Sequence, residues 1–308
     1  MRHIMEMVGK TRVVIEDGAV VEVFNPDIYW CPLFEKARGI QKIDPAEVKK
    51  NMEFRIREFG FFTPERKLDG FEDFVGFGAS ETMMSGLKHG IIDASVSVCD
   101  GAGTVVTKNP SLVQGMGARM SGLVYTEPIP EIIQKIKDRD GIIPDEKTAA
   151  IDPLLGAKTA ADLGFKKIAV TVADAKTAEK IRNFQNERNN EKNNVGNNEK
   201  NNIGNNEKNN IGNNEIYFLI IAVHTTGISK EESEELKKYA DIVTLCASKH
   251  LREIKPLLQV GTAVPLIALT QAGRELLLER AKYVNSTLLV NTMPLPVLPE
   301  QKQPKELV

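Results

Sequence analysis

Short apolar runs alternate with amphipathic segments through the second half of the chain. The apolar runs predict strands, and the segments between them predict helices. The predicted strands are Lys167–Ala173, Ile216–Val223, Asp241–Cys246, Val264–Thr270 and Thr287–Asn291. The predicted helices are Asp174–Gln185, Lys230–Ala240, Ser248–Ile254 and Gln271–Tyr283. Because strands joined by helical crossovers pair in parallel, this half is expected to be a mostly parallel, doubly wound α/β sheet.

The first half of the chain has a less regular pattern. It opens with two apolar segments, Arg12–Glu16 and Ala19–Phe24, on either side of Asp17-Gly18, which is a typical hairpin turn. An antiparallel β-hairpin is therefore expected at the start of a less regular α/β region. Further along, the pattern predicts helices over Pro45–Glu58 and Glu81–His89 and a buried strand over Ile91–Val98.

A repeat of eight residues, Asn-Asn-Glu-Lys-Asn-Asn-(Val/Ile)-Gly, occupies residues 189–212. One apolar side chain in each unit cannot offset the entropy of ordering it, so residues 186–215 are expected to form a disordered Asn-rich insertion. Residues 294–308 contain several prolines and are expected to form a flexible tail. The remainder is divided into an N-terminal α/β region, 1–150, and a C-terminal doubly wound region, 151–293.

The charges are nearly balanced, with 40 Lys and Arg against 42 Asp and Glu. No broad positive field favours nucleic acid or anionic membranes, so neither is an expected partner. The longest apolar run, Ile216–Val223, is too short to span a membrane, and charged residues interrupt the only candidate signal segment. Cys31, Cys99 and Cys246 are widely spaced and form no CxxC pair, which favours a reducing, cytoplasmic location.

Candidate chemistry gathers after the predicted strands, because ligands of open parallel sheets bind beyond the carboxyl ends of the strands. Cys99 follows one such strand and is a candidate nucleophile or metal ligand, with Asp100 as the group that orients a base or substrate. Gly101 and Gly103 would let backbone N–H groups face a ligand or an oxyanion. The alternative is a buried cysteine that acts as a small hydrophobic residue beside a tight turn.

Two further strand ends carry reactive side chains. His224 is a candidate general base or metal ligand, and Cys246 precedes a predicted helix whose dipole would favour the thiolate. Cys31, Cys99, Cys246 and His224 could together hold a metal or an iron–sulfur cluster, although their spacing matches no compact ligand signature. Ordinary hydrogen bonding of the histidine and core packing of the cysteines is the alternative.

A glycine-rich run, Gly115–Gly122, could expose backbone amides to a phosphate, with Arg119 supplying positive charge. Gly115, Gly117 and Arg119 are therefore candidate cofactor-binding residues. The run is not a dinucleotide fingerprint, because Met120 stands where a third glycine is required. Close helix packing permitted by small residues is the alternative.

Three motifs carry a resemblance to a known family. They are Gly78-Ala79-Ser80-Glu81, the segment Cys99–Val105, and the long run Asn109–Gly122, which is followed by Thr126-Glu127-Pro128-Ile129. On these motifs the chain resembles the archaeal methanogenesis marker protein 8 family. The resemblance implies a cytoplasmic protein of methane-producing archaea, linked to methanogenesis, and it supplies no catalytic residues.

Several functional hypotheses follow. The first is a cysteine-dependent enzyme or a protein that handles sulfur or metal. The second is a non-catalytic accessory factor for assembly or activation of the methane-forming enzyme system, with a protein partner in methanogenesis. A regulator that binds a small molecule or nucleotide is the third.

Overall fold

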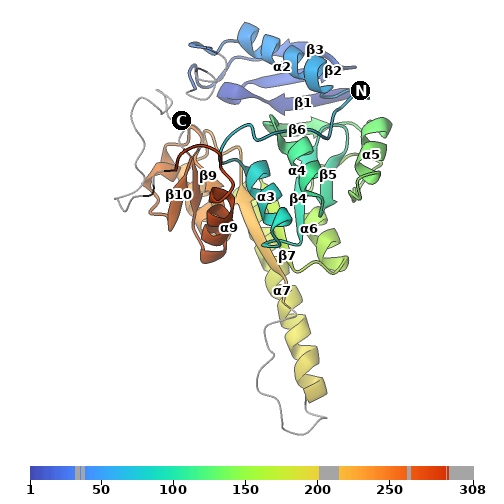
Figure 1. Cartoon of the computed structure of the whole chain (residues 1–308), viewed down its shortest axis with the longest axis vertical. Helices are drawn as coiled ribbons and strands as arrows, with labels where there is room; N and C mark the ends of the chain where they lie inside the picture. The colour runs from blue at the N-terminus through green and yellow to red at the C-terminus, as the bar shows by residue number, and fades with distance from the viewer. Residues whose placement is uncertain (32–34, 36–38, 201–214, 262–264, 289, 291–308) are drawn as a thin grey trace.

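Two β-sheets organise the chain (Figure 1). The computed structural model describes residues 1–31, 35, 39–200, 215–261, 265–288 and 290, without the side chains of 192–200. A four-stranded sheet and one helix form a layer across one end of a larger, seven-stranded sheet (Figure 1).

The larger sheet is mostly parallel, as predicted, with the strand order β10-β11-β9-β8-β7-β4-β5. Its four central strands, β9, β8, β7 and β4, pair in parallel, and the remaining strands join antiparallel at the two edges. The strands are β4 (Ala94–Cys99), β5 (Gly103–Thr107), β7 (Lys167–Val172), β8 (Tyr217–Ala222), β9 (Ile242–Thr244), β10 (Leu258–Val260) and β11 (Leu266–Ala268).

Helices cover both faces of this sheet, which confirms the doubly wound prediction. On one face lie α6 (Pro153–Asp162), α7 (Ala175–Lys200) and α8 (Lys230–Tyr239), whose alanines and leucine pack on the strands. On the other face lie α3 (Ala79–Lys88), α4 (Pro110–Gly117) and α9 (Gln271–Ala281). Between α4 and α6 the chain also forms α5 (Pro130–Lys137), which packs through Ile132 and Ile136.

The smaller sheet contains the predicted hairpin. Its order is β3-β2-β1-β6, all antiparallel, with strands β1 (Arg2–Glu6), β2 (Arg12–Glu16), β3 (Ala19–Val23) and β6 (Gly122–Thr126). Asp17 and Gly18 both have positive φ, 48° and 75°, which suits the tight turn of a twisted hairpin. The 3₁₀ turn η1 (Val8–Lys10) joins β1 to β2, and α2 (Pro45–Phe59) packs on the sheet through Val48 and Met52.

The connection after β9 departs from the prediction. Residues predicted to form a helix over 248–254 form only the 3₁₀ turn η2 (His250–Glu253), and β11 pairs antiparallel with β9. A parallel pair needs a long crossover, whereas an antiparallel strand can return through a short one. The strand predicted at Thr287–Asn291 is not formed at residues 287, 288 and 290; residues 289 and 291 lie outside the described residues.

Helix α7 continues to Lys200, so residues 186–200 are helical rather than the expected disordered loop. Extending an existing helix avoids the cost of nucleating a new one. The Asn189 amide also donates to the carbonyl oxygen of Ile216 and accepts from its N–H, both at 2.9 Å, which fixes the helix beside β8. Residues 201–214, within the expected insertion, and the predicted tail, 294–308, lie outside the described residues.

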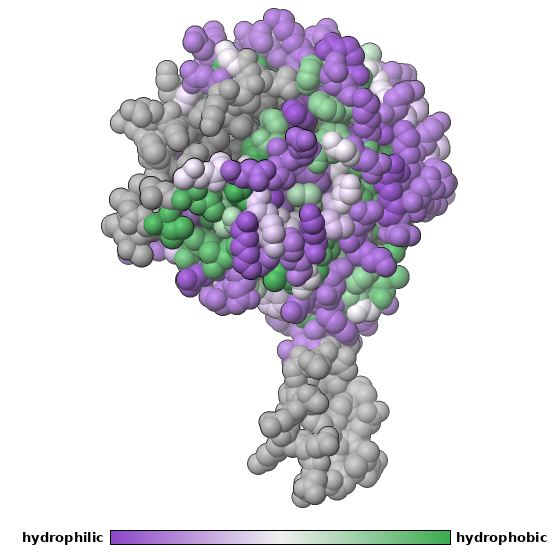
Figure 2. All heavy atoms as spheres, in the orientation of Figure 1, coloured by the Kyte–Doolittle hydropathy of each residue, from purple (hydrophilic) through white to green (hydrophobic). Residues whose placement is uncertain are grey.

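One sheet crosses the boundary that the sequence suggested at residue 150, because β4 and β5 precede it and β7 to β11 follow it. The surface seen in Figure 2 is mainly hydrophilic, with hydrophobic side chains gathered near β10, where Leu257 is 51% exposed. Over the described ranges, none of the helices is both long enough and apolar enough to cross a membrane.

Candidate functional site

A cavity of about 250 Å³ lies at the carboxyl ends of the parallel strands. Its floor takes side chains from near the ends of five neighbouring strands, and they include Ser97, Thr171, Val223, Thr244 and Leu266. On other sides it is bounded by α3 and α4, by the loop before α3, and by Arg55 of α2. We call it the strand-end cavity. It occupies the place where open α/β sheets bind their ligands.

One wall of the strand-end cavity is a phenylalanine-rich loop, residues 71–77, of which Phe74, Val75 and Phe77 line the cavity. Arg280 of α9, which is buried, holds this loop by donating to the Gly76 carbonyl oxygen at 2.8 Å and by pairing with Asp73. The loop is therefore tied to α9, which lies on the same face of the sheet as α3 and α4.

Glu81 of α3 also holds the phenylalanine-rich loop in place. Its buried carboxylate accepts hydrogen bonds from the backbone N–H groups of Phe74 and Val75, at 3.1 and 3.4 Å. Ser80 Oγ and Gln114 Nε2 also donate to it, at 3.0 and 3.3 Å. The carboxylate is thus occupied by protein donors.

Arg119 supplies a cation to the cavity. It follows α4 with a positive φ of 64°, and its guanidinium lies over the rings of Phe59 and Phe74, 4.9 and 4.5 Å from their centroids. Desolvation by burial lowers its pKa, although an arginine of this kind keeps its charge near neutral pH. No carboxylate within the described part of the chain pairs with it. The side chain is therefore available to an anion.

Cys99 lies at the end of β4, fully buried in an apolar cluster with Leu68 and Met116. Burial raises the pKa of its thiol well above the usual range, and the nearby Asp100 carboxylate raises it further. Reactive cysteines need the thiolate, which this environment disfavours. The nucleophilic role of Cys99 stays a prediction, and its surroundings count against it.

Asp100 is part of a buried ion pair. Its Oδ1 accepts from Arg66 Nε at 2.9 Å, and its Oδ2 accepts from the Phe62 N–H at 2.7 Å. Neither charged side chain of the pair is exposed. Both carboxylate oxygens are thus engaged in holding the loop after α2, and a catalytic role for Asp100 stays a prediction.

Gly101 and Gly103 form the turn of the β4–β5 hairpin, with φ of 73° and 70°. The Gly101 N–H already donates to Thr126 Oγ1 at 2.7 Å. A Cβ on Gly103 would lie 2.2 Å from the Ala149 carbonyl oxygen. Glycine at these two positions allows other backbone segments to approach closely. Ligand binding by Gly101 and Gly103 stays a prediction.

Gly115 and Gly117 lie in the last turns of α4, where small residues allow close packing. A Cβ on Gly115 would lie 1.9 Å from the Leu68 carbonyl oxygen, and one on Gly117 would lie 2.5 Å from Ser80 Cβ. Both glycines thus lie in close contacts, Gly117 also lines the strand-end cavity, and cofactor binding by the two stays a prediction.

His224 and Cys246 have separate partners. His224, with φ of 59°, places Nε2 2.6 Å from Glu6 Oε2, and this hydrogen bond lowers the pKa of Glu6. The Cys246 Sγ lies 3.7 Å from Thr244 Oγ1, and Arg252 donates to the Cys246 carbonyl oxygen at 2.8 Å. Among the residues that the structure describes, no three His, Cys, Asp or Glu side chains are grouped to hold a metal ion. The proposed metal ligation by Cys99 and Cys246 stays a prediction.

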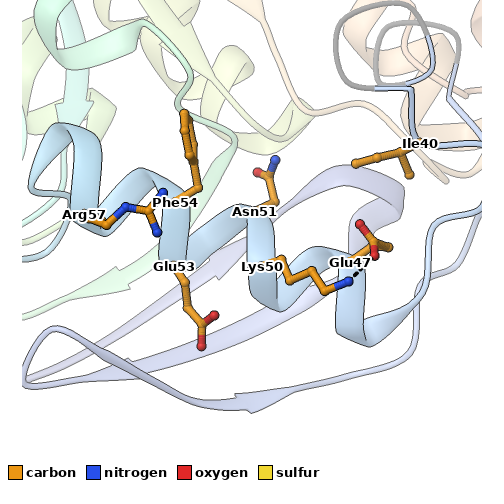
Figure 3. A pocket seen from close by; sticks show the side chains of 7 residues that line it. All are labelled: Ile40, Glu47, Lys50, Asn51, Glu53, Phe54 and Arg57. Carbon is orange, nitrogen blue, oxygen red and sulfur yellow. Dashed lines mark hydrogen bonds and ion pairs between the residues drawn. The ribbon is translucent and has the colours of Figure 1, made fainter.

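A second hollow, of about 550 Å³, follows the outer side of α2 (Figure 3). Glu47 and Lys50 form an ion pair there at 2.6 Å. The Asn51 side chain also lines this groove, and its buried amide nitrogen and oxygen have no hydrogen-bond partner.

The cavity residues that belong to the strands were not predicted from the sequence as site residues. Ser97 lies within the segment predicted as a buried strand, and Thr171 and Thr244 lie within two other predicted strands. A hydroxyl in an otherwise apolar strand was the available signal. This signal identifies each residue as unusual, but it does not show that the three residues line the same cavity.

Comparison with known proteins identifies the family. The model of a family described as "Uncharacterized protein conserved in archaea (DUF2099)" matches residues 3–282. An uncharacterised protein of Methanocaldococcus jannaschii is 44% identical over 310 residues, which cover 100% of this chain and 99% of that protein. No solved structure matches the chain. The chain therefore belongs to this family of proteins conserved in archaea.

Proposed function

We propose that this protein binds a small anionic molecule in the strand-end cavity. The observation that carries the proposal is Arg119, a half-buried cation that lines the cavity between two phenylalanine rings. Burial of a charge is unfavourable unless another group compensates it, and an anionic ligand would do so. Charge-assisted hydrogen bonds from a guanidinium are also stronger than neutral ones.

The volume limits the size of the ligand. A cavity of about 250 Å³ holds roughly eight water molecules, at about 30 Å³ of liquid volume each. That space suits a metabolite of low molecular mass and is too small for a whole dinucleotide. Of the three functional classes that the sequence left open, the small-molecule binder therefore has the strongest support.

The test compares an acid with an amine of the same skeleton, phenylacetate and phenethylamine, at constant ionic strength. Phenylacetate at ten times its Kd should raise the free energy of unfolding by about 1.4 kcal/mol, seen as a higher Tm, and phenethylamine should not. Arg119→Met should abolish the shift. Arg274→Met, at an exposed position on α9, is the matched control and should retain it. Equal shifts in the wild type and in Arg119→Met would refute the proposal.

We also propose that the protein acts in methanogenesis in the cytoplasm of archaea, as an enzyme or as an accessory factor. Support comes from the motif resemblance and from the 44% identical protein of Methanocaldococcus jannaschii. Cys31, Cys99 and Cys246 form no disulfide, which agrees with a reducing compartment. Deletion of the gene in a methanogen should slow methane formation. An unchanged rate of methane formation would contradict this role without bearing on the cavity.

A further inference from the structure

The floor of the strand-end cavity carries an unpaired hydroxyl. Ser97 of β4 is 8% exposed, and its Oγ is buried without a hydrogen-bond partner. Buried polar groups in folded proteins nearly always have a partner, so an exception in a cavity wall indicates a missing one. Because Ser97 lines the strand-end cavity, a molecule bound there can supply this partner.

Two more hydroxyls on the floor are restricted to accepting hydrogen bonds. Thr171 Oγ1 donates its proton to the Val96 carbonyl oxygen at 3.3 Å, and Thr244 Oγ1 donates to the Ala222 carbonyl oxygen at 3.1 Å. A hydroxyl has one proton and two lone pairs. Each threonine therefore offers the cavity only acceptor capacity, part of which Thr244 uses for the Cys246 thiol at 3.7 Å.

Apolar side chains supply much of the remaining lining. Met83 of α3, Val113 of α4 and Leu266 of β11 belong to it. Arg119 reaches the cavity from the end of α4, whereas the hydroxyls belong to the strands. The wall thus presents a cation and a group of hydroxyls with apolar surface beside them.

From this lining we infer that the ligand is an acid that also carries a hydroxyl or amino group remote from its anionic end, with an apolar body between them. The inference rests on the proposed anion site at Arg119. The remote group donates to the hydroxyls of Ser97, Thr171 or Thr244, to one of them if it is a hydroxyl with its single proton, while the anion binds Arg119. An acid without a donor leaves the Ser97 hydroxyl unpaired, so the site discriminates against it.

Matched probes test the inference by calorimetry. The first, 4-hydroxyphenylacetate, has an acid and a remote hydroxyl donor. The second, 4-methylphenylacetate, has the same shape without the donor. The third, 4-methylphenol, lacks the acid. The wild type should bind the hydroxy acid at least tenfold more tightly than the methyl acid.

Substitutions on the floor of the strand-end cavity test whether its hydroxyls cause the preference for the hydroxy acid over the methyl acid. Ser97→Ala should reduce the preference to less than threefold while the methyl acid still binds. Thr171→Val should reduce it too, and serves if Ser97→Ala fails to fold. The control is Ser95→Ala on the same strand, because the Ser95 hydroxyl already donates to the Thr107 carbonyl oxygen at 3.3 Å. It should keep the full preference.

The possible outcomes separate the inference from the proposed function. Equal affinity for the two acids in the wild type, with both lost in Arg119→Met, would overturn the inference and leave the anion site standing. A preference that persists in both Ser97→Ala and Thr171→Val would overturn it as well. Failure of either acid to bind, or binding unaffected by Arg119→Met, would overturn the anion site itself.

Discussion

Removal of the Asp100 carboxylate should destabilise the protein strongly. In Asp100→Ala the Arg66 guanidinium keeps its burial but loses the oxygen 2.9 Å from Nε, and the Phe62 N–H loses its acceptor. Breaking a buried ion pair from one side costs about 3–5 kcal/mol, because the remaining charge is uncompensated. At roughly 2–4 °C for each kcal/mol, the Tm should fall by about 6–20 °C.

A second ion pair of the same composition provides the control. Asp69 pairs with Arg139 at the surface, where the Asp69 side chain is 54% exposed. Exposed pairs contribute about 0–1 kcal/mol, so Asp69→Ala should have little effect. Denaturation by urea, followed by circular dichroism, measures both variants and also the double variant Asp100→Ala with Arg66→Met. The double variant should be more stable than Asp100→Ala alone, because it leaves no buried charge without a partner.

A loss of less than about 1 kcal/mol in Asp100→Ala, the size expected of an exposed pair, would refute the reasoning. It would mean that the carboxylate does not bear the structural role assigned to it. The predicted function of Asp100 as an orienting group would then regain support, since a carboxylate that is not needed for folding is free for chemistry.

Three further outcomes are expected. Iodoacetamide at pH 8 should label Cys246 and leave Cys99 unlabelled in the folded protein, because burial raises the pKa of the Cys99 thiol; peptide mapping that finds equal labelling would contradict this. Burial lowers the pKa of His3 from 6.5 to about 4, so the unfolded chain binds a proton that the folded chain does not. The free energy of unfolding should therefore fall by about 3 kcal/mol as the pH drops from 6.5 to 4. The His3→Gln variant should show a smaller pH dependence of this free energy, measured by urea denaturation at each pH; a pH dependence equal to that of the wild type would exclude His3 as its cause. Asn189→Ala should cost about 1–3 kcal/mol, because it leaves the backbone N–H and carbonyl of Ile216 without partners; a wild-type urea midpoint would show that the contact is unimportant.

The elements that the sequence predicted well are those with strong local signals. Strand β8 and helix α8 lie within a residue or so of their predicted bounds. Ser229 Oγ accepts from the Glu232 N–H at 3.1 Å and begins α8 at the expected place. Hydrophobic period and caps act over a few residues, so a single sequence contains them.

The pairing of the strands was harder to predict from the sequence. Strand β1 pairs with β6, more than a hundred residues later, and β11 returns antiparallel beside β9. Such pairings depend on which surfaces meet after the chain collapses, and no local pattern encodes that. The expected boundary at residue 150 was inferred from local regularity, whereas the long-range pairing of β4 with β7 joins the two sides.

For the site, the sequence by itself determined where chemistry could be sought, at the carboxyl ends of the strands, and it identified Arg119 as a candidate cation. The tertiary structure decided which of those residues face a cavity. Cys99 ends a strand as predicted, but the chain turns back at once into β5 and buries the thiol. Ser97, two residues earlier, lines the cavity instead. The physical reason is that a residue's position along a strand is local, whereas its exposure depends on segments far away in the sequence that pack against it.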